Sequence, residues 1–404
     1  MAKLFGVSGT IAAFLAQVCS SLNSFAIIIL SGWYLGLADH GYFVFGVALC
    51  QVVLSLVRAL CGETFIVLAT RGTDLQAVLN SAVTAAMYCA VIGGVACLGF
   101  GLVWPEYRDA LVASAVVVLA VCFMDAVRYG AIALKRSYLL FVGDLVGLVG
   151  TVIGFIVAGR FSTSPVVFLA VWGAMCCVVG VILALALGYR PVSIRVAGAW
   201  LKRNFARSSA FFAEAALGAT AGTAILAVMA IVTSSEEISI FRTALTVMGI
   251  TGLMNNFLRS TVLRELSPER IADRRYLLGA FCAMVAAVSV VVVVFGGMIW
   301  LLPTNISVAV FGANFLAVLP VLLPAIIHRL CSSCSTIPTI FLRAQGVTWS
   351  ATKIRIAVIV VGIIIGPLGA YIAGAQGAIL GDMVTYLALF IGLTLLMFRT
   401  AART

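Results

Sequence analysis

Long apolar segments recur along the whole sequence, and short polar breaks separate them. A membrane-spanning helix needs about 20 mostly apolar residues, and twelve segments reach that length. They cover residues 10–35, 42–69, 79–103, 110–134, 138–158, 165–188, 208–232, 238–262, 276–302, 310–341, 351–373 and 376–398. The breaks, such as Trp104-Pro105-Glu106, are too short to hold a folded soluble domain. The pattern therefore predicts an all-α polytopic membrane protein with twelve transmembrane helices.

The tenth segment, 310–341, is longer than one span requires and contains Pro320, Pro324 and Pro338. Proline removes a backbone donor and clashes with the preceding turn of a helix. The segment is therefore either one kinked helix or a helix broken at these prolines.

The composition excludes the soluble classes of protein. Of the 404 residues, 63% are hydrophobic and 10% are charged, against roughly 25% charged residues in a typical soluble domain. A soluble core of this size would need more polar surface than these residues provide. We therefore set aside soluble enzymes, nucleic-acid-binding modules and disulfide-rich secreted scaffolds.

Lysine and arginine are distributed unevenly between the two sides of the predicted bundle. Cytoplasmic segments of membrane proteins carry the excess of these residues. With both termini placed inside, the inner loops and ends hold eighteen of them, and the outer loops hold only Arg108 and Arg160. We expect both termini to lie in the cytoplasm and the chain to cross a bacterial-type inner membrane many times. This topology accounts for the net charge of +11 without a nucleic-acid partner.

A basic stretch at 190–207 divides the chain near its midpoint. We expect an N-terminal lobe of six helices over 1–189 and a C-terminal lobe of six helices over 208–404. The stretch mixes bases with apolar residues such as Trp200 and Phe205. That mixture suits an amphipathic helix on an anionic leaflet, and a solvated loop is the alternative.

Three patches of the sequence resemble a known family. Leu37–Phe45 resembles the start of the second helix of polysaccharide and O-antigen flippases, which belong to the multidrug/oligosaccharidyl-lipid/polysaccharide exporter superfamily. Glu236–Leu245 looks like the start of that family's eighth helix, although many members have Gly where this chain has Ile240. Arg343–Gly346 and the later Gly374–Ala378 are similar to its last helices. The resemblance implies two six-helix lobes around a central cavity that opens alternately to the two sides of the membrane.

Ten ionisable residues fall inside the predicted spans. Each costs about 2.5–3.5 kcal/mol there unless it finds water or a partner, so each is a candidate for function. The candidate substrate ligands are Arg58, Arg128, Arg242, Arg259 and Arg329. The candidate coupling or pairing carboxylates are Glu63, Asp125, Asp144, Glu214 and Asp382. The alternative is pairing between helices, and the three-residue spacing of Asp125 and Arg128 would also allow these two to pair on one helix.

The arginines favour an anionic ligand. Arginine stays charged, whereas a buried carboxylate can take up a proton, and guanidinium suits bidentate contact with phosphate. Together with the resemblance, this points to a flippase for a lipid-linked oligosaccharide that carries a pyrophosphate, working with membrane lipids and other polysaccharide-assembly proteins. The alternative is a multidrug efflux antiporter of the same superfamily. A membrane polymerase or ligase is a weaker hypothesis, because no large outer loop is present, and we expect no enzyme activity.

The remaining signals are weaker. Cys331 and Cys334 have redox spacing but no second cysteine pair to complete a metal site, so we expect helix packing rather than metal chemistry. No cofactor is indicated. His40 is expected in a loop, and His328 is either a cavity residue or a buried histidine with a partner.

The orientation can be tested with reporter fusions or with labelling of introduced cysteines. We expect residues 190–207 and 264–275 to report from the cytoplasm and 236–237 from outside, because of the positive-inside bias. Labelling of 190–207 from outside would contradict the orientation.

Overall fold

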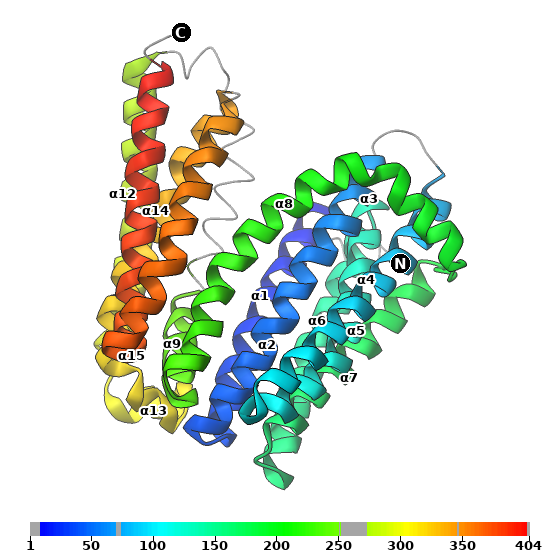
Figure 1. Ribbon diagram of the computed structural model, residues 1–404, viewed down its shortest axis with the longest axis horizontal. Coiled ribbons are helices and arrows are strands. Elements are labelled where there is room, and N and C mark those ends of the chain that lie inside the picture. The colour runs from blue at the N-terminus through cyan, green and yellow to red at the C-terminus, as the bar shows by residue number, and fades with distance from the viewer. Residues whose placement is uncertain (1–8, 70–73, 250, 252–272, 346, 402–404) are drawn as a thin grey trace. The chain divides into compact units, whose positions relative to one another are not determined.

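The computed structural model describes residues 9–69, 74–249, 251, 273–345 and 347–401, and the regular elements among them are helices (Figure 1). The chain forms two compact units, residues 1–223 (unit 1) and 224–404 (unit 2). Their boundary falls inside one long helix. The division expected at 190–207 therefore stays a prediction.

Unit 1 is built around a central helix, α5. Its elements are α1 Gly9–Tyr34, α2 Leu37–Val57, η2 Arg58–Glu63, α3 Thr64–Ala69, α4 Leu75–Val103, η3 Pro105–Tyr107, α5 Arg108–Ala133, α6 Ser137–Phe161, α7 Pro165–Ala186 and the first part of α8 Ile194–Val232. Helix α5 contacts α2, α4, α6 and α7, and α1 packs along α6. Side chains of α5 are therefore placed to reach most of the unit.

Aromatic side chains fill the core of unit 1. Phe43, Phe155 and Phe168 come from α2, α6 and α7 and are each 0% exposed. The ring centroids of Phe155 and Phe168 lie 5.1 Å apart in an edge-to-face arrangement, which aromatic pairs favour. This cluster fixes the three helices against one another.

The expectation that His40 lies in a loop is wrong. Helix α2 begins at Leu37, so His40 lies in its first turn and is 1% exposed. Its Nε2 atom is 3.0 Å from the carbonyl oxygen of Ile28 in α1. Asp39 and His40, whose polarity suggested a loop, therefore lie in the first turn of α2. The contact of His40 with Ile28 joins α2 to α1.

The chain that follows α7 is tied to one face of α4. The Gln76 side chain donates to the carbonyl oxygen of Gly188 at 2.8 Å, and the backbone N–H of Arg190 donates to Asn80 at 2.9 Å. Helix α8 then begins at Ile194 and continues without a break to Val232. Residues 194–207 are thus helical, as the amphipathic alternative requires, while their position on a leaflet stays a prediction.

Unit 2 is built around α14. Its elements are the end of α8, α9 Ser235–Gly249, α12 Arg274–Trp300, α13 Thr304–Phe311, η4 Ala313–Ala317, α14 Leu319–Ala344 and α15 Thr348–Ala401. Helix α14 contacts α9, α12 and α15. The eighth predicted span, 238–262, is described as far as the end of α9 and at Thr251; the rest of it lies outside the described residues.

The tenth predicted segment is interrupted, but not at its prolines. Helix α13 ends at Phe311, the next residue Gly312 has a φ of 86°, and a short 3-10 helix leads into α14. Pro324 and Pro338 lie inside α14, and Pro320 lies in its first turn. Prolines are tolerated in membrane helices because neighbouring groups satisfy the freed backbone atoms. Of the two alternatives, the structure shows a helix that continues through its prolines.

Helix α15 is a hairpin of two helices joined at Ala373 and Gly374, whose backbone angles are not helical. Figure 1 shows its two parts side by side, in orange and red, and Gly381 lies against the backbone of Ile365. The turn agrees with the predicted division into spans 351–373 and 376–398. The Glu237 carboxylate accepts the backbone N–H of Ala375 just after this turn, so α9 is joined to the hairpin.

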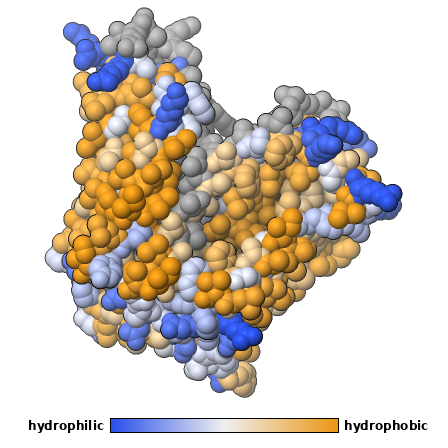
Figure 2. Space-filling model, viewed as in Figure 1, coloured by the Kyte–Doolittle hydropathy of each residue, from blue (hydrophilic) through white to orange (hydrophobic). Residues whose placement is uncertain are grey.

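Apolar side chains cover the lengths of the helices, and hydrophilic ones gather near helix ends (Figure 2). In the part of the chain that the structure describes, nine helices are long and apolar enough to cross a membrane. One of these nine is the 52-residue stretch Trp349–Thr400, which the hairpin turn divides into two spans. The length and composition of these helices agree with a polytopic membrane protein.

The α15 turn provides a test of the fold. Gly374 has a φ of 55°, and a Cβ atom there would overlap the Glu237 carboxylate. We expect Gly374→Ala to lower the free energy of unfolding by about 1–3 kcal/mol, because such backbone conformations are accessible almost only to glycine. Thermal unfolding in detergent measures the change.

Gly297→Ala in α12 is the matched control, because a Cβ there meets no atom within 4 Å. Equal melting temperatures for the two alanine variants would contradict the account of the turn.

Candidate functional site

The structure divides the predicted intramembrane charges between the two units. Unit 1 holds Arg58, Glu63, Asp125, Arg128 and Asp144, and unit 2 holds Arg242, Arg329 and Asp382. Arg259 and the side chain of Glu214 lie outside the described residues. The two sets differ in how their charges are compensated.

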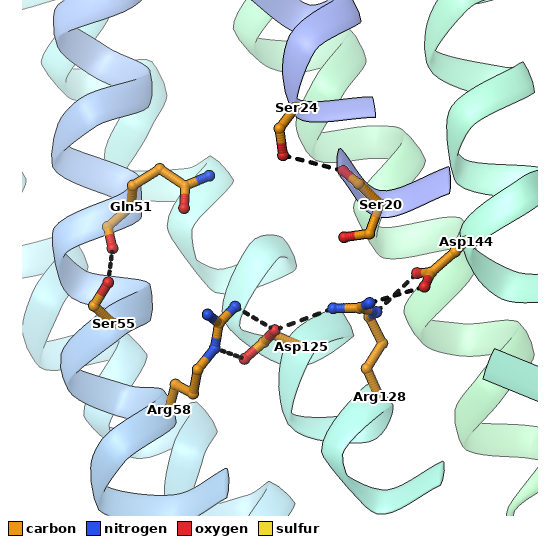
Figure 3. Close-up of polar contacts among 8 residues, drawn as sticks. All are labelled: Ser20, Ser24, Gln51, Ser55, Arg58, Asp125, Arg128 and Asp144. Carbon is orange, nitrogen blue, oxygen red and sulfur yellow. Dashed lines mark hydrogen bonds and ion pairs between the residues drawn. The ribbon is translucent and has the colours of Figure 1, made fainter. Parts of the chain in front are cut away.

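Four of the charges in unit 1 form one continuous ion chain across three helices (Figure 3). The guanidinium of Arg58 donates to both carboxylate oxygens of Asp125, at 3.0 Å from Nε and 2.7 Å from Nη2. The Arg128 guanidinium contacts both oxygens of Asp144, at 2.7 Å from Nε and 2.8 Å from Nη2. Arg128 also lies 3.6 Å from Asp125. The chain therefore runs from α2 through α5 to α6.

The inner members of this ion chain are withdrawn from solvent. The side chains of Asp125 and Asp144 are 3% and 5% exposed, and that of Arg128 is 12% exposed. Arg58, at one end, is 35% exposed. Paired bidentate contacts offset the cost of burying these charges. The arrangement favours the pairing alternative, but with partners on other helices rather than mainly between Asp125 and Arg128.

A π-helical turn, η2, positions Arg58. It extends from Arg58 to Glu63 at the end of α2, and such turns occur frequently at functional sites. Gly62 lets the Tyr129 ring approach, because a Cβ there would lie 2.8 Å from that ring. The Arg58 Cζ atom is 5.6 Å from the centre of the same ring, a cation–π distance. The π turn has no signal in the apolar pattern, so sequence reasoning missed it.

Uncharged polar side chains lie near the ion chain on α1 and α2, as Figure 3 shows. The Ser55 hydroxyl donates to the Gln51 carbonyl at 2.8 Å, and the Ser24 hydroxyl donates to the Ser20 carbonyl at 3.2 Å. These hydroxyls are therefore satisfied within their own helices. They make the region more polar without changing its charge.

Arg242 and Arg329, the described candidate arginines of unit 2, form no ion pair with a described carboxylate. Arg329 donates from Nε to the Thr251 hydroxyl at 2.8 Å and from Nη2 to the Gly249 carbonyl at 3.5 Å. The Nε atom of Arg242 is buried and makes no hydrogen bond to any described residue. Two guanidinium charges in this unit are therefore not neutralised by the carboxylates that the structure describes.

The acid of unit 2 has a histidine partner. His328 in α14 and Asp382 in α15 meet through Nε2 and Oδ2 at 2.8 Å. Of the two alternatives for His328, the buried histidine with a partner is the one that the structure shows, since His328 is 5% exposed. Its neighbour Cys331 is a free cysteine, as is Cys334.

The centre of the ion chain provides a test. Asp125→Asn removes the carboxylate that lies between Arg58 and Arg128, and we expect a loss of about 3 kcal/mol in stability, because breaking a buried pair leaves an uncompensated charge. Thermal unfolding in detergent and abundance in the membrane measure the loss.

Asp109→Asn is the matched control, since Asp109 lies in the first turn of the same helix and is exposed. If the two amide variants unfold at the same temperature, the ion chain does not stabilise unit 1.

Neither a protein-family profile nor a curated protein sequence matches this chain. Solved structures do match it. The lipid II flippase MurJ in an inward closed conformation aligns with a TM-score of 0.73 at 12% identity, covering 97% of this chain and 89% of that one. An inward-facing multidrug resistance transporter of the MATE family, from the MOP superfamily, aligns with a TM-score of 0.65 at 12% identity, covering 96% and 98%.

The eukaryotic MATE transporter AtDTX14 aligns with a TM-score of 0.60 at 12% identity, covering 97% of this chain and 96% of that one. At these identities the matches establish the fold alone. The chain has the helical, two-lobe membrane fold of these transporters, as the sequence predicted.

Proposed function

We propose that this protein is a flippase that moves a lipid-linked, pyrophosphate-bearing oligosaccharide from the cytoplasmic to the outer leaflet by alternating access, for the synthesis of cell-surface polysaccharide. The observation that carries the proposal is the pair of guanidinium groups in unit 2, Arg242 and Arg329, which have no carboxylate partner among the described residues. The fold shared with a lipid II flippase supports it.

An anionic head group would compensate these arginines. A guanidinium presents a planar fork that binds two phosphate oxygens at once. Arg329 is oriented through Nε by Thr251, and its Nη2 contact with Gly249 is long at 3.5 Å, so its outer nitrogens are available to a ligand. Pyrophosphate would offer several charged oxygens to two such groups.

The arginines of unit 1 are less suited to first contact with a ligand. Arg128 is held by Asp144 and lies next to Asp125, so a phosphate would have to displace a bidentate carboxylate. Arg58 is the accessible end of the ion chain. We therefore assign substrate binding first to Arg242 and Arg329, then to Arg58, and give Arg128 a positioning role.

The alternative function is a multidrug efflux antiporter, which would carry a cationic compound rather than an anionic one. The alignment with MATE transporters is compatible with this function.

Transport by the full chain in vesicles distinguishes the two functions. We expect the wild type to move a fluorescent polyprenyl-pyrophosphate-linked saccharide between leaflets, and Arg242→Gln or Arg329→Gln to slow this movement by about tenfold or more, because each removes a charge-assisted contact to phosphate. Loss of fluorescence on adding an impermeant quencher measures the leaflet distribution.

Arg160→Gln is the control, because Arg160 is exposed at the end of α6 and should leave the rate unchanged. Export of ethidium, without movement of the labelled saccharide, would instead establish the efflux function. Equal rates in both arginine variants and the wild type would remove these residues from the substrate site.

A further inference from the structure

The contact between His328 and Asp382 is placed between two helices that form the centre of unit 2. The imidazole Nε2 is 2.8 Å from the carboxylate Oδ2, and the side chains are 7% and 17% exposed. The Tyr386 ring meets the His328 ring edge-on, with centroids 5.3 Å apart. Tyr386 follows Asp382 by one turn of α15, so one face of α15 supplies both contacts.

The other nitrogen of the imidazole has no hydrogen-bond partner among the described residues. His328 Nδ1 is buried and makes no hydrogen bond with any residue that the structure describes. A neutral imidazole that donates from Nε2 leaves Nδ1 as an acceptor, whereas a protonated imidazole needs an acceptor for Nδ1–H as well. The carboxylate therefore favours the protonated ring, while the absence of an acceptor at Nδ1 favours the neutral ring.

Other charged and titratable groups lie on the elements that pack against α14. From α15, Asp382 and Tyr386 contact His328, Arg355 donates to Thr339 of α14, and Lys353 and Arg399 are carried near the helix ends. Helix α9 contributes Glu236, Arg242 and Glu237, which accepts the Ala375 N–H. The arginine next to the histidine, Arg329, is directed to Thr251. Helix α12 carries its charges only in its first turn, and η4 carries none.

We propose that His328 and Asp382 form a proton-binding site that couples protonation of unit 2 to the contact between α14 and α15. Without the extra proton, Nε2–H donates to the carboxylate and the pair carries one negative charge. One proton taken up at Nδ1 makes the pair neutral overall and converts its hydrogen bond into an ion pair, which is stronger. The site requires no particular substrate, so it is independent of the proposed flippase activity.

The position of the pair on α14 links the proton to movement. Pro324 and Pro338 lie on either side of His328 within this helix, and each removes a backbone hydrogen bond where the helix can bend. A bend that gives Nδ1 an acceptor or water would increase the proton affinity of the ring. By linkage, proton uptake would then favour the bent arrangement by the same free energy.

Nuclear magnetic resonance of the full chain in lipid nanodiscs can observe this proton directly. The sequence has 2 histidines, so protein labelled with ¹⁵N-histidine gives two sets of ring signals, and His40→Asn assigns them. We expect the His328 ring signals to change reversibly with pH as the ring takes up a proton. In Asp382→Asn its proton affinity should fall by about tenfold or more, because the carboxylate that stabilises the imidazolium is lost.

Asp109→Asn is the matched control and should leave the His328 signals unchanged, while thermal unfolding of Asp382→Asn near the wild-type temperature shows that the variant is folded. A His328 ring that does not titrate, or that titrates at the same pH in Asp382→Asn, would overturn the proposal.

Hydrogen–deuterium exchange tests the link to the helix contact. After correction for intrinsic exchange, the protection of peptides from 319–344 should differ between a pH where His328 is protonated and one where it is neutral. Asp382→Asn should abolish this difference. Equal protection in the wild type across the titration would show a proton site that is not coupled to α14.

Discussion

The burial of the Asp125 carboxylate between two guanidinium groups is the interaction on which unit 1 depends. A charge inside a membrane-spanning bundle must find a partner, because neither lipid nor apolar side chains can solvate it. Asp125 is on α5, the helix that contacts most of the unit, and Arg58 and Arg128 approach it from either side. The positions of α2, α5 and α6 are therefore set by charge pairing as well as by the aromatic core.

The two units use charge differently. In unit 1 the contacts extend from one bidentate pair to the next, which suits a rigid element that holds helices in register. In unit 2 the Arg329 guanidinium binds a hydroxyl and a carbonyl, and the Asp382 carboxylate binds an imidazole, which can change its charge. Arginines without a described carboxylate partner, together with a histidine–carboxylate pair, are suited to binding and release, which is why we propose unit 2 as the main site of the functional chemistry.

The sequence was sufficient to predict the helical spans, because span length and apolar composition are local properties. It also identified the ionisable residues, since each is conspicuous in an apolar segment. It did not reveal that Arg58 binds Asp125, residues separated by 67 positions, because such partners depend on tertiary packing. The interruption at Gly312 and the helical position of His40 were also missed. Prolines and polar residues indicate where a helix can end, but tertiary packing decides whether it ends there.

Glu237 shows how a residue outside the ion chain can join distant parts of the sequence. It belongs to the patch that resembles the start of the family's eighth helix, and it binds the backbone of Ala375, in a patch that resembles the last helices. The two patches are therefore parts of one contact, in which a carboxylate caps the N-terminus of the second part of α15. That part carries Asp382 two turns later. The geometry of the His328–Asp382 pair thus depends on a helix whose start is fixed by α9, so Glu237 helps to set the position of the proposed proton site.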